Sequence, residues 1–344
     1  MEIQPKENHE LTTTQQIGKI ANHLAGLSAF QNYRKRRSSN TQRRQLADLN
    51  LFTEYLAGKG FEDRDLYNNP EDWRDITFGL VEGFVKWMVQ KSYAVSTINF
   101  RLSTVKKYAE LAHKATQAIP FQEVVMIKDV KGYSRKESAR VNKDREAQGI
   151  DTRRGHKKEN WVSISKDQAR QLKMQPATPQ GYRDAVIMGI LLDHGLRVGE
   201  LANLKVDNID LENNVMKFYR PKTDETNTHE LKNGTLKAIR KYLEIANLAK
   251  DDFLLCGSDK HGNLTTPGMK TQNITKRVKV LGEQIGIDGL SAHDCRHYYA
   301  TQMIRNGTPM DVAMSAGGWK TPSMVIRYIE QNKIANAGVN LGED

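Results

Sequence analysis

The sequence predicts a mainly α-helical protein of two domains, with a small β-hairpin or sheet in the second domain. Three observations lead to this prediction. Apolar residues recur at helical spacing through most of the 344 residues, and one stretch around Pro221 alternates as a strand does. Residues 131–158 combine ten Lys and Arg with four Asp and Glu and almost no large apolar side chain. Because such a segment cannot bury a core, we expect a mobile basic linker at 131–160 between the domains.

The first domain, residues 39–130, is expected to be a helical bundle. Three of its helices are predicted within 40–60, 77–91 and 94–114. Two of them carry an apolar stripe at helical spacing, which consists of Leu46, Leu49, Phe52 and Leu56 in the first and of Ile98, Leu102, Val105, Tyr108 and Leu111 in the third. Helices with such stripes turned inward can bury a core of their own.

Basic side chains gather at the start of this bundle. Residues 1–38 are expected to form a flexible basic N-terminal arm, and the run 33–44 holds six basic residues and no acid. Such a run is typical of a solvated arm, and it would also lie well along a phosphate backbone. The predicted nucleic-acid contacts are Arg34, Arg36, Arg37, Arg43 and Arg44 from this run, with Arg101, Lys106 and Lys107 from the third helix.

The second domain is expected to span residues 161–332. Ser165 and Gln168 stand at capping-box spacing at the start of its first helix, and an apolar helix ends at Gly195. An alternating stretch with Pro221 at its turn predicts the β-hairpin. Further helices are expected at 234–247, 275–286, 294–307, 309–318 and 323–333.

The composition narrows the class of partner. Lys and Arg total 52 against 41 Asp and Glu, a formal net charge of +11 that favours a polyanion, most commonly a nucleic acid. No stretch approaches the ~18 apolar residues of a membrane span, and the polar amino terminus is unlike a secretory signal. Cys256 and Cys295 are too few for a disulfide scaffold or a Cys-based zinc site, which fits a reducing cytosol.

The stretch AHDCRHYYATQ admits a zinc site or a phosphate site. His293 and His297 are four residues apart, which is zinc spacing on a helix, but Arg296 between them would oppose a metal charge and no third ligand stands nearby. Arg296 and His293 instead reach one side of a helix start, and Arg197 follows a helix that ends at glycine. Two arginines and a histidine suit a phosphate whose charge rises during reaction, so the phosphate site is favoured.

Three boxes at fixed spacing resemble the tyrosine recombinase, or phage integrase, family. They read GLRVGELANLKVDNID, HDCRH and GGWKTPSMVIRYIE. The family has Arg in the first box, His-x-x-Arg in the second, and in the third His or Trp with a Tyr nine residues later. This sequence supplies, in that order, Arg197, His293, Arg296, Trp319 and Tyr328. The likeness extends over both predicted domains, since the N-terminal helices resemble the family's core-binding domain.

The resemblance implies a site-specific DNA recombinase whose two domains form a C-shaped clamp on DNA. Tyr328 would attack the scissile phosphate, giving a 3′-phosphotyrosyl link and a free 5′-hydroxyl, and the exchange would pass through a Holliday junction. Arg197 and Arg296 would hold the nonbridging oxygens. His293 would assist proton transfer or bind the phosphate, and Glu200 would brace the first arginine. Because the phosphotyrosine conserves the bond energy, no ATP, metal or other cofactor is expected.

Two catalytic positions depart from the commoner pattern or stay open. The family uses a lysine on a hairpin turn to protonate the leaving oxygen; Lys222 is the best match, and Lys217 and Lys232 remain alternatives. Trp319 stands where most members have His, as in a Cre-like branch, and its indole can only donate a hydrogen bond. His297 is then expected to be a support residue rather than a metal ligand.

The resemblance also implies the partners and leaves two other functions open. The partner would be double-stranded DNA with specific recombination sites, bound by a homotetramer in the cytoplasm, at the nucleoid of a prokaryote or on a mobile element. The polar segment after Tyr328, residues 329–344, which ends in the C-terminal tail at 333–344, is expected to dock on a neighbouring subunit. The sequence says nothing of accessory proteins. The alternatives are a non-catalytic DNA-binding protein of the same fold and a type IB topoisomerase-like enzyme.

Overall fold

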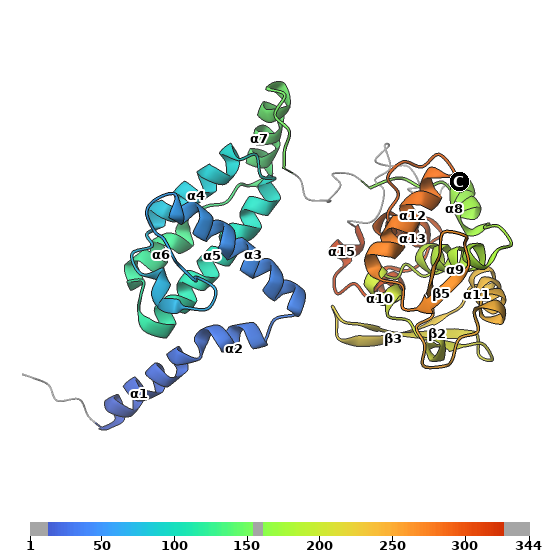
Figure 1. Cartoon of the computed structure of the whole chain (residues 1–344), viewed down its shortest axis with the longest axis horizontal. Coiled ribbons are helices and arrows are strands. Elements are labelled where there is room, and N and C mark those ends of the chain that lie inside the picture. Colours follow the sequence, from blue (N-terminus) through green and yellow to red (C-terminus); the bar gives the residue numbers. More distant parts are fainter. Residues whose placement is uncertain (1–12, 154–160, 327–344) are drawn as a thin grey trace, which may run out of the picture. The chain divides into compact units, whose positions relative to one another are not determined.

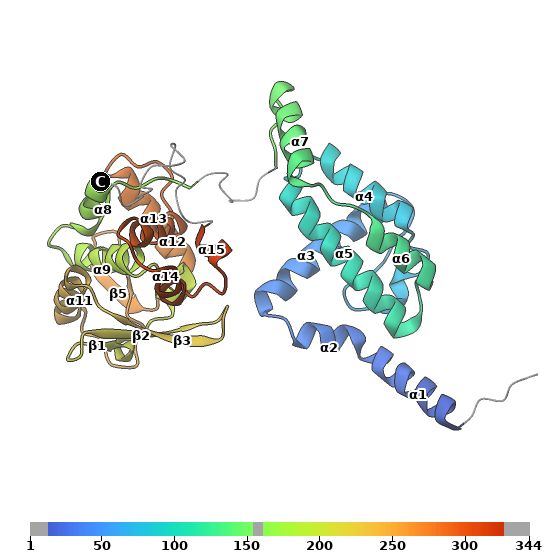
Figure 2. The ribbon, with the colours of Figure 1, turned by 180° about the vertical axis from the view of Figure 1, so that it is seen from behind.

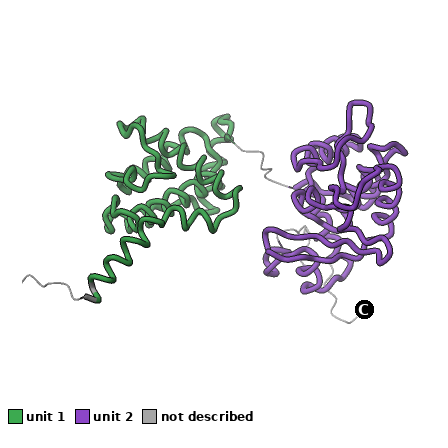
Figure 3. The backbone as a smooth tube through the Cα atoms, turned by 60° about the horizontal axis from the view of Figure 1, so that its bottom comes forward, with its two compact units in different colours: residues 1–157 green, residues 158–344 purple. Residues whose placement is uncertain are grey.

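The computed structural model describes residues 13–153 and 161–326, which belong to two compact units (Figure 3). Unit 1 is residues 1–157 and unit 2 is residues 158–344. Each unit has a hydrophobic core of its own. The predicted class is confirmed: the described elements are mostly helices, with small antiparallel sheets in unit 2. Tyr328 and the tail at 333–344 lie outside the described residues.

Unit 1 is helical throughout its described part (Figures 1 and 2). Its long central helix packs against most of the others, and its core is rich in aromatic rings. The elements are α1 (Thr13–Leu27), α2 (Ala29–Lys35), α3 (Ser39–Ala57), the 3₁₀ turn η1 (Pro70–Trp73), α4 (Phe78–Gln90), the central α5 (Val95–Thr116), α6 (Phe121–Asp129) and α7 (Arg135–Ala147). The predicted apolar stripe of α5 is buried over its whole length, whereas that of α3 was wrong at Leu46, which is exposed.

Residues 13–35 form helices, so the prediction of a flexible arm at 1–38 was wrong for this part. Phe30 of α2 is buried in the core of unit 1, where its ring meets that of Tyr108 edge-on at 5.2 Å. Gly26 of α1 lies so close to α5 that a Cβ there would be 2.6 Å from the carbonyl oxygen of Lys114. One aromatic anchor and one glycine contact therefore fix a segment whose composition is polar.

The expected linker at 131–160 also contains a helix, α7. Its first turn closes a capping box, in which Ser134 accepts from the backbone of Glu137 and the Glu137 side chain accepts in return. Arg145 is buried and donates at 3.0 and 2.9 Å to two backbone carbonyls at and just after the end of α4. The prediction was wrong here because polar contacts, rather than apolar burial, hold this helix against unit 1.

Unit 2 surrounds the strongly apolar helix α9 with helices and two small sheets (Figures 1 and 2). The first elements are α8 (Lys166–Lys173), α9 (Pro179–Asp193), α10 (Val198–Ala202), the 3₁₀ turn η2 (Val206–Asn208), β1 (Ile209–Asp210), β2 (Val215–Arg220) and β3 (Glu225–Glu230). They are followed by α11 (Asn233–Ala246), β4 (Cys256–Ser258), β5 (Leu264–Pro267), α12 (Thr271–Glu283), α13 (Ala292–Arg305), α14 (Met310–Gly317) and α15 (Pro322–Ile326).

The predicted hairpin and capping box are confirmed. Strands β2 and β3 pair antiparallel with Arg220 opposite Glu225, and β1 adds a third strand beside β2. Ser165 and Gln168 close the capping box of α8. Among the helices that the structure describes, none is both long and apolar enough to cross a membrane.

Candidate active site

Arg197 stands at the start of a short helix with its guanidinium held on one side. Gly195, with φ +61°, turns the chain after α9, and Arg197 is the N-cap of α10. Its Nη1 donates to Oε1 of Glu200 at 2.6 Å, and its backbone N–H donates to Oε2 at 2.8 Å. The Glu200 side chain is 2% exposed and that of Arg197 is 28% exposed. Arg197 is therefore fixed from behind and open to a ligand in front.

Arg296 is buried at the junction of three segments. It lies on α13, whose first turn is capped reciprocally by Ser291 and Asp294. Its Nη1 donates at 2.5 Å to the carbonyl of Gly195, and its Nη2 donates to the carbonyl of Gly317. One guanidinium thus connects helix α13 to the turn after α9 and to the end of α14. Its acceptor Gly195 lies two residues before Arg197 in that turn.

The two histidines of α13 have different surroundings. His293 is exposed at the start of the helix, while His297 is buried and stacks on Trp161 at a centroid distance of 4.8 Å. The two imidazoles meet edge-on at 5.0 Å. Within the described ranges, no cluster of three or more His, Cys, Asp or Glu side chains is placed to hold a metal ion. His297 thus has a packing contact that suits a support residue.

Trp319 is buried beside Arg296. The Arg296 guanidinium carbon lies 4.5 Å from the centroid of the Trp319 ring, a cation–π contact. A Cβ on Gly317 would overlap the same ring, and Gly318 takes φ +61°, so both glycines are needed for the chain to turn here. Trp319 is a predicted site residue, and in the structure it packs against Arg296, one of the two predicted phosphate-binding arginines.

Arg220, which the sequence reading missed, is fully buried at the end of β2. Its Nη1 donates to Oε2 of Glu200 at 3.3 Å and to the carbonyl of Gly317 at 3.1 Å. A signal was present in the sequence: Met216, Phe218 and Arg220 alternate with exposed residues, so all three belong to one face of the strand. A charged residue on an inward strand face requires a partner, and here that partner is the carboxylate that also holds Arg197.

The three lysines considered for the leaving group lie at different places on the hairpin. Lys222 is exposed in the tight turn between β2 and β3, and Lys217 is exposed on β2 opposite Thr228. Lys232 is the N-cap of α11 and lines a hollow beside α14. Of the three lysines, Lys222 is the one that lies in the turn of the hairpin.

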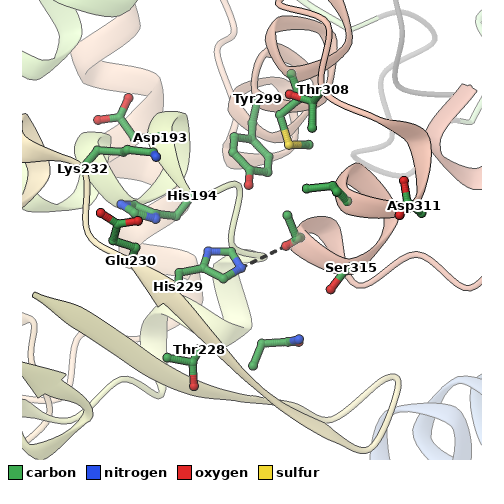
Figure 4. Close-up of a pocket in the computed structure, with 14 residues that line it drawn as sticks. Asp193, His194, Thr228, His229, Glu230, Lys232, Tyr299, Thr308, Asp311 and Ser315 are labelled. Atoms are coloured by element: carbon green, nitrogen blue, oxygen red, sulfur yellow. Dashed lines mark hydrogen bonds between the residues drawn. The ribbon is translucent and has the colours of Figure 1, made fainter. Parts of the chain in front are cut away.

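A hollow of about 620 Å³ lies between β3, α13 and α14 (Figure 4). His194, His229 and Tyr299 surround it, and Nε2 of His229 donates at 3.0 Å to the carbonyl of Ala316. Burial, with the nearby cations Lys232 and Lys173, lowers the pKa of His194 to about 4. Burial likewise lowers the pKa of His229 to about 3. Both imidazoles are therefore neutral at physiological pH.

The basic residues predicted to contact nucleic acid differ in how far unit 1 already engages them. Arg36, Arg37, Arg43 and Arg44 are exposed. Arg34 donates to Asn68 and stacks over Tyr67, Arg101 pairs with Asp48 at 3.6 Å, Lys106 donates to the carbonyl of Lys128, and Lys107 pairs with Glu110 at 3.3 Å. Three of the exposed four also have contacts in unit 1: Arg37 lies over the Tyr33 ring, Arg43 donates to Asn40 and Arg44 is 3.8 Å from Asp48. The first four therefore differ from the others in exposure and not in the presence of contacts.

Comparisons with known proteins identify a matching family and similar chains. The model of the phage integrase family matches residues 163–334. A probable integrase/recombinase protein of Methanocaldococcus jannaschii is 29% identical over 159 residues, which cover 45% of this chain and 48% of that relative. Tyrosine recombinase XerC of Roseiflexus castenholzii is 23% identical over 302 residues, which cover 86% of this chain and 84% of the relative. The chain thus spans about half of the first relative and most of the second.

A solved structure shares the fold. The crystal structure of a lambda integrase tetramer bound to a Holliday junction matches with a TM-score of 0.56 at 12% identity, over 92% of this chain and 84% of that chain. At this identity the likeness establishes the fold, and the roles of individual side chains rest on the geometry described above.

Proposed function

The chain belongs to the phage integrase family, and from this premise we infer that it is a tyrosine recombinase, an enzyme of site-specific DNA recombination. Arg197 and Arg296 are the proposed clamp for the two nonbridging oxygens of the scissile phosphate. The observation that carries this proposal is that both arginines are attached to one turn, Gly195–Arg197. Arg197 belongs to the turn, and Arg296 donates to its first carbonyl. A bound phosphate would therefore meet both cations in a fixed relation.

The proposed chemical step is a transesterification. The hydroxyl oxygen of Tyr328 bonds to phosphorus, and the bond from phosphorus to the 5′-oxygen breaks. The phenol proton leaves with the help of His293, and the leaving oxygen takes a proton from Lys222. One phosphodiester is replaced by one 3′-phosphotyrosyl diester, so the reverse attack by a 5′-hydroxyl needs no ATP, metal or other cofactor. Trp319 would donate to the phosphate or pack the segment that follows it.

The proposed partner is double-stranded DNA that carries specific recombination sites. The net charge of +11 and the exposed arginines of unit 1 support binding to the phosphate backbone. The lambda integrase that shares this fold is a tetramer on a Holliday junction, which supports a homotetramer and the same intermediate here. Exchange at nucleoid or mobile-element DNA, in the cytoplasm, follows from that substrate as part of the proposal.

Trapping of the covalent intermediate tests the function. Purified protein would be incubated, without magnesium or ATP, with a pool of nicked fragments from its host replicon or element. Denaturing gels and peptide mapping would then locate the adduct. We expect an adduct on Tyr328 that Tyr328→Phe abolishes and that Tyr298→Phe, a control in α13, leaves in place.

Each other result points to a different function. Tight binding with no adduct on any bound fragment would favour the non-catalytic DNA-binding protein. An adduct at many sequences, with relaxation of supercoiled DNA by a monomer, would favour the topoisomerase-like enzyme. An adduct on a tyrosine other than Tyr328 would contradict the assignment of the third box.

A further inference from the structure

Arg220 is a buried cation whose partners belong to two parts of the site. Its side chain is 0% exposed. Four donor contacts are seen: Nε to the side-chain oxygen of Asn227, Nη1 to Glu200 and to the carbonyl of Gly317, and Nη2 to the carbonyl of Ala316 at 2.8 Å. A buried charge is tolerated only when its hydrogen-bonding groups are satisfied in this way. The guanidinium is therefore occupied by the protein itself.

On one side, Arg220 supports the arginine that faces the ligand. Glu200 accepts from Arg197 through Oε1 and from Arg220 through Oε2. The carboxylate thus lies between an arginine that is fully enclosed and one that is 28% exposed. Because Glu200 is fixed from behind by Arg220, its other oxygen holds Arg197 in one orientation.

On the other side, Arg220 holds the end of α14. The carbonyls of Ala316 and Gly317 are among the last of that helix, where the helix dipole is negative and acceptors lack partners within the helix. A Cβ at Gly318 would come within 2.8–3.1 Å of the Arg220 side chain, so the chain runs directly over the guanidinium at this point. Trp319 follows immediately, and its backbone N–H donates to the carbonyl of Met314 at 2.9 Å.

We propose that Arg220 is a positioning residue for the cleavage step. It links the Glu200–Arg197 pair to the turn Gly317–Trp319, so that the phosphate clamp and the segment leading to the nucleophile keep a fixed relation. This inference rests on the proposed function for its effect on catalysis, whereas its effect on the α14 turn does not. Because all three guanidinium nitrogens of Arg220 already donate within the protein, Arg220 acts through these two groups.

Two variants loosen the link in different ways. Arg220→Lys keeps the charge but cannot bridge the carboxylate and two carbonyls with one planar fork. Asn227→Ala keeps Arg220 and removes only the acceptor of its Nε. The matched control is Arg240→Lys: Arg240 is exposed and donates to the carbonyl of Leu211 in the turn between β1 and β2.

The first readout needs no DNA. Hydrogen exchange would be followed at the amides of residues 314–319, whose N–H groups close the end of α14. In Arg220→Lys we expect about 10-fold faster exchange there, a smaller increase in Asn227→Ala, and no change in Arg240→Lys. Unchanged exchange in a folded Arg220→Lys protein would overturn the proposal, whether or not the protein is a recombinase.

The second readout is single-turnover formation of the covalent adduct on the trapped site. In Arg220→Lys we expect about 10²-fold slower cleavage with DNA affinity within about twofold of wild type, since a misplacement near 1 Å has an effect of that size. A substrate with sulfur as the 5′-leaving atom, which needs no proton, should leave the defect in place. Rescue by that sulfur would instead make Arg220 a proton donor and overturn the positioning role.

Failure of the proposed function gives a separate result. If wild-type protein forms no adduct while exchange at 314–319 still rises in Arg220→Lys, the recombinase proposal fails and the structural link stands. If wild type forms the adduct and Arg220→Lys forms it equally fast, the link has no role in cleavage.

Discussion

Two buried carboxylates in unit 2 each bind two arginines, but the two clusters use their guanidinium donors to different extents. Asp184 accepts from Arg183 at 2.7 Å and from Arg277 at 2.6 Å, and the remaining contacts of both arginines go to Cys256 and Gln180. This cluster joins α9 to α12 and to the β4 strand. All three guanidinium nitrogens of Arg183, and Nε and Nη2 of Arg277, donate within the fold, so this cluster serves to hold the helices together.

Glu200 also binds two arginines, but one of them is buried and the other is partly exposed. Arg220 is enclosed and bonded to the end of α14, while Arg197 uses only Nη1 on the carboxylate. Among the residues that the structure describes, the other side-chain donors of Arg197 have no hydrogen-bond acceptor. The two clusters therefore differ in how many guanidinium donors the fold uses, and the proposed phosphate-binding role belongs to the arginine that is held along a single edge.

The largest expected effect is a loss of folding stability when the Asp184 cluster is changed. Asp184→Asn leaves Arg183 buried without its countercharge, and breaking a buried pair costs about 3–5 kcal/mol. Urea unfolding should show a loss of this size. Asp167→Asn, which removes an exposed pair with Arg170, is the control and should change the unfolding free energy by less than about 1 kcal/mol. A loss below 1 kcal/mol in Asp184→Asn would remove the distinction between the clusters.

The next largest effect is expected on catalysis, when Arg197 in the Glu200 cluster is changed. Arg197→Lys should slow adduct formation by about 10²–10³-fold, because a single ammonium cannot both pair with Glu200 and hold the phosphate. Arg277→Lys is the matched variant, since Arg277 is also part-exposed, at 22%, but is bonded within the fold. It should lower stability and leave single-turnover cleavage within about threefold. Equal loss of cleavage in both variants would mean that partial exposure of an arginine, rather than the guanidinium nitrogens that Arg197 leaves unused, determines its role in cleavage.

The hollow beside α14 supplies a contrast, because burial and nearby cations disfavour the charged form of its two imidazoles. Burial lowers the pKa of His194 from 6.5 to about 4. Between these two pH values His194 is protonated in the unfolded chain and neutral in the folded chain. Stability present above pH 6.5 is therefore lost as the pH falls toward 4. At pH 4.5, His194→Gln should reduce this loss by about 2–3 kcal/mol relative to pH 7. A pH profile identical to wild type would contradict the buried, neutral His194.

The smallest effect concerns a looser cluster in unit 1. Asp48 is 3.8 Å from Arg44 and 3.6 Å from Arg101 and accepts from Thr104, yet burial raises its pKa. Its ionised form is thus less favourable in the folded than in the unfolded chain, and any stability from the protonated form is lost as the pH rises.

Asp48→Asn should accordingly leave the unfolding free energy at pH 7 unchanged or raise it by up to about 1 kcal/mol. Glu54→Gln, an exposed position on α3, is the control. A loss of about 3 kcal/mol or more in Asp48→Asn would place this cluster with that of Asp184.

Local patterns determined those elements whose cause is local. The stripe of α5 and the capping box of α8 were read from spacing alone, because periodicity and a three-residue cap do not depend on distant chain. The helix α7 was missed because its anchor, Arg145, reaches two carbonyls that lie more than 50 residues earlier in the chain. The same holds for residues 13–35, which are fixed by contacts with α5.

By itself, the sequence determined the candidate site through order and spacing: Arg197, Glu200 and Arg296 were named before any contact was known. Only the tertiary structure decided that Arg220 joins them. Asn227 on the paired strand is its nearest partner in the chain, whereas its acceptors at Ala316 and Gly317 come from the end of a helix almost 100 residues away. Pairs of this kind cannot be found from residue spacing, because the fold sets how far apart in the chain a donor and its acceptor carbonyl lie.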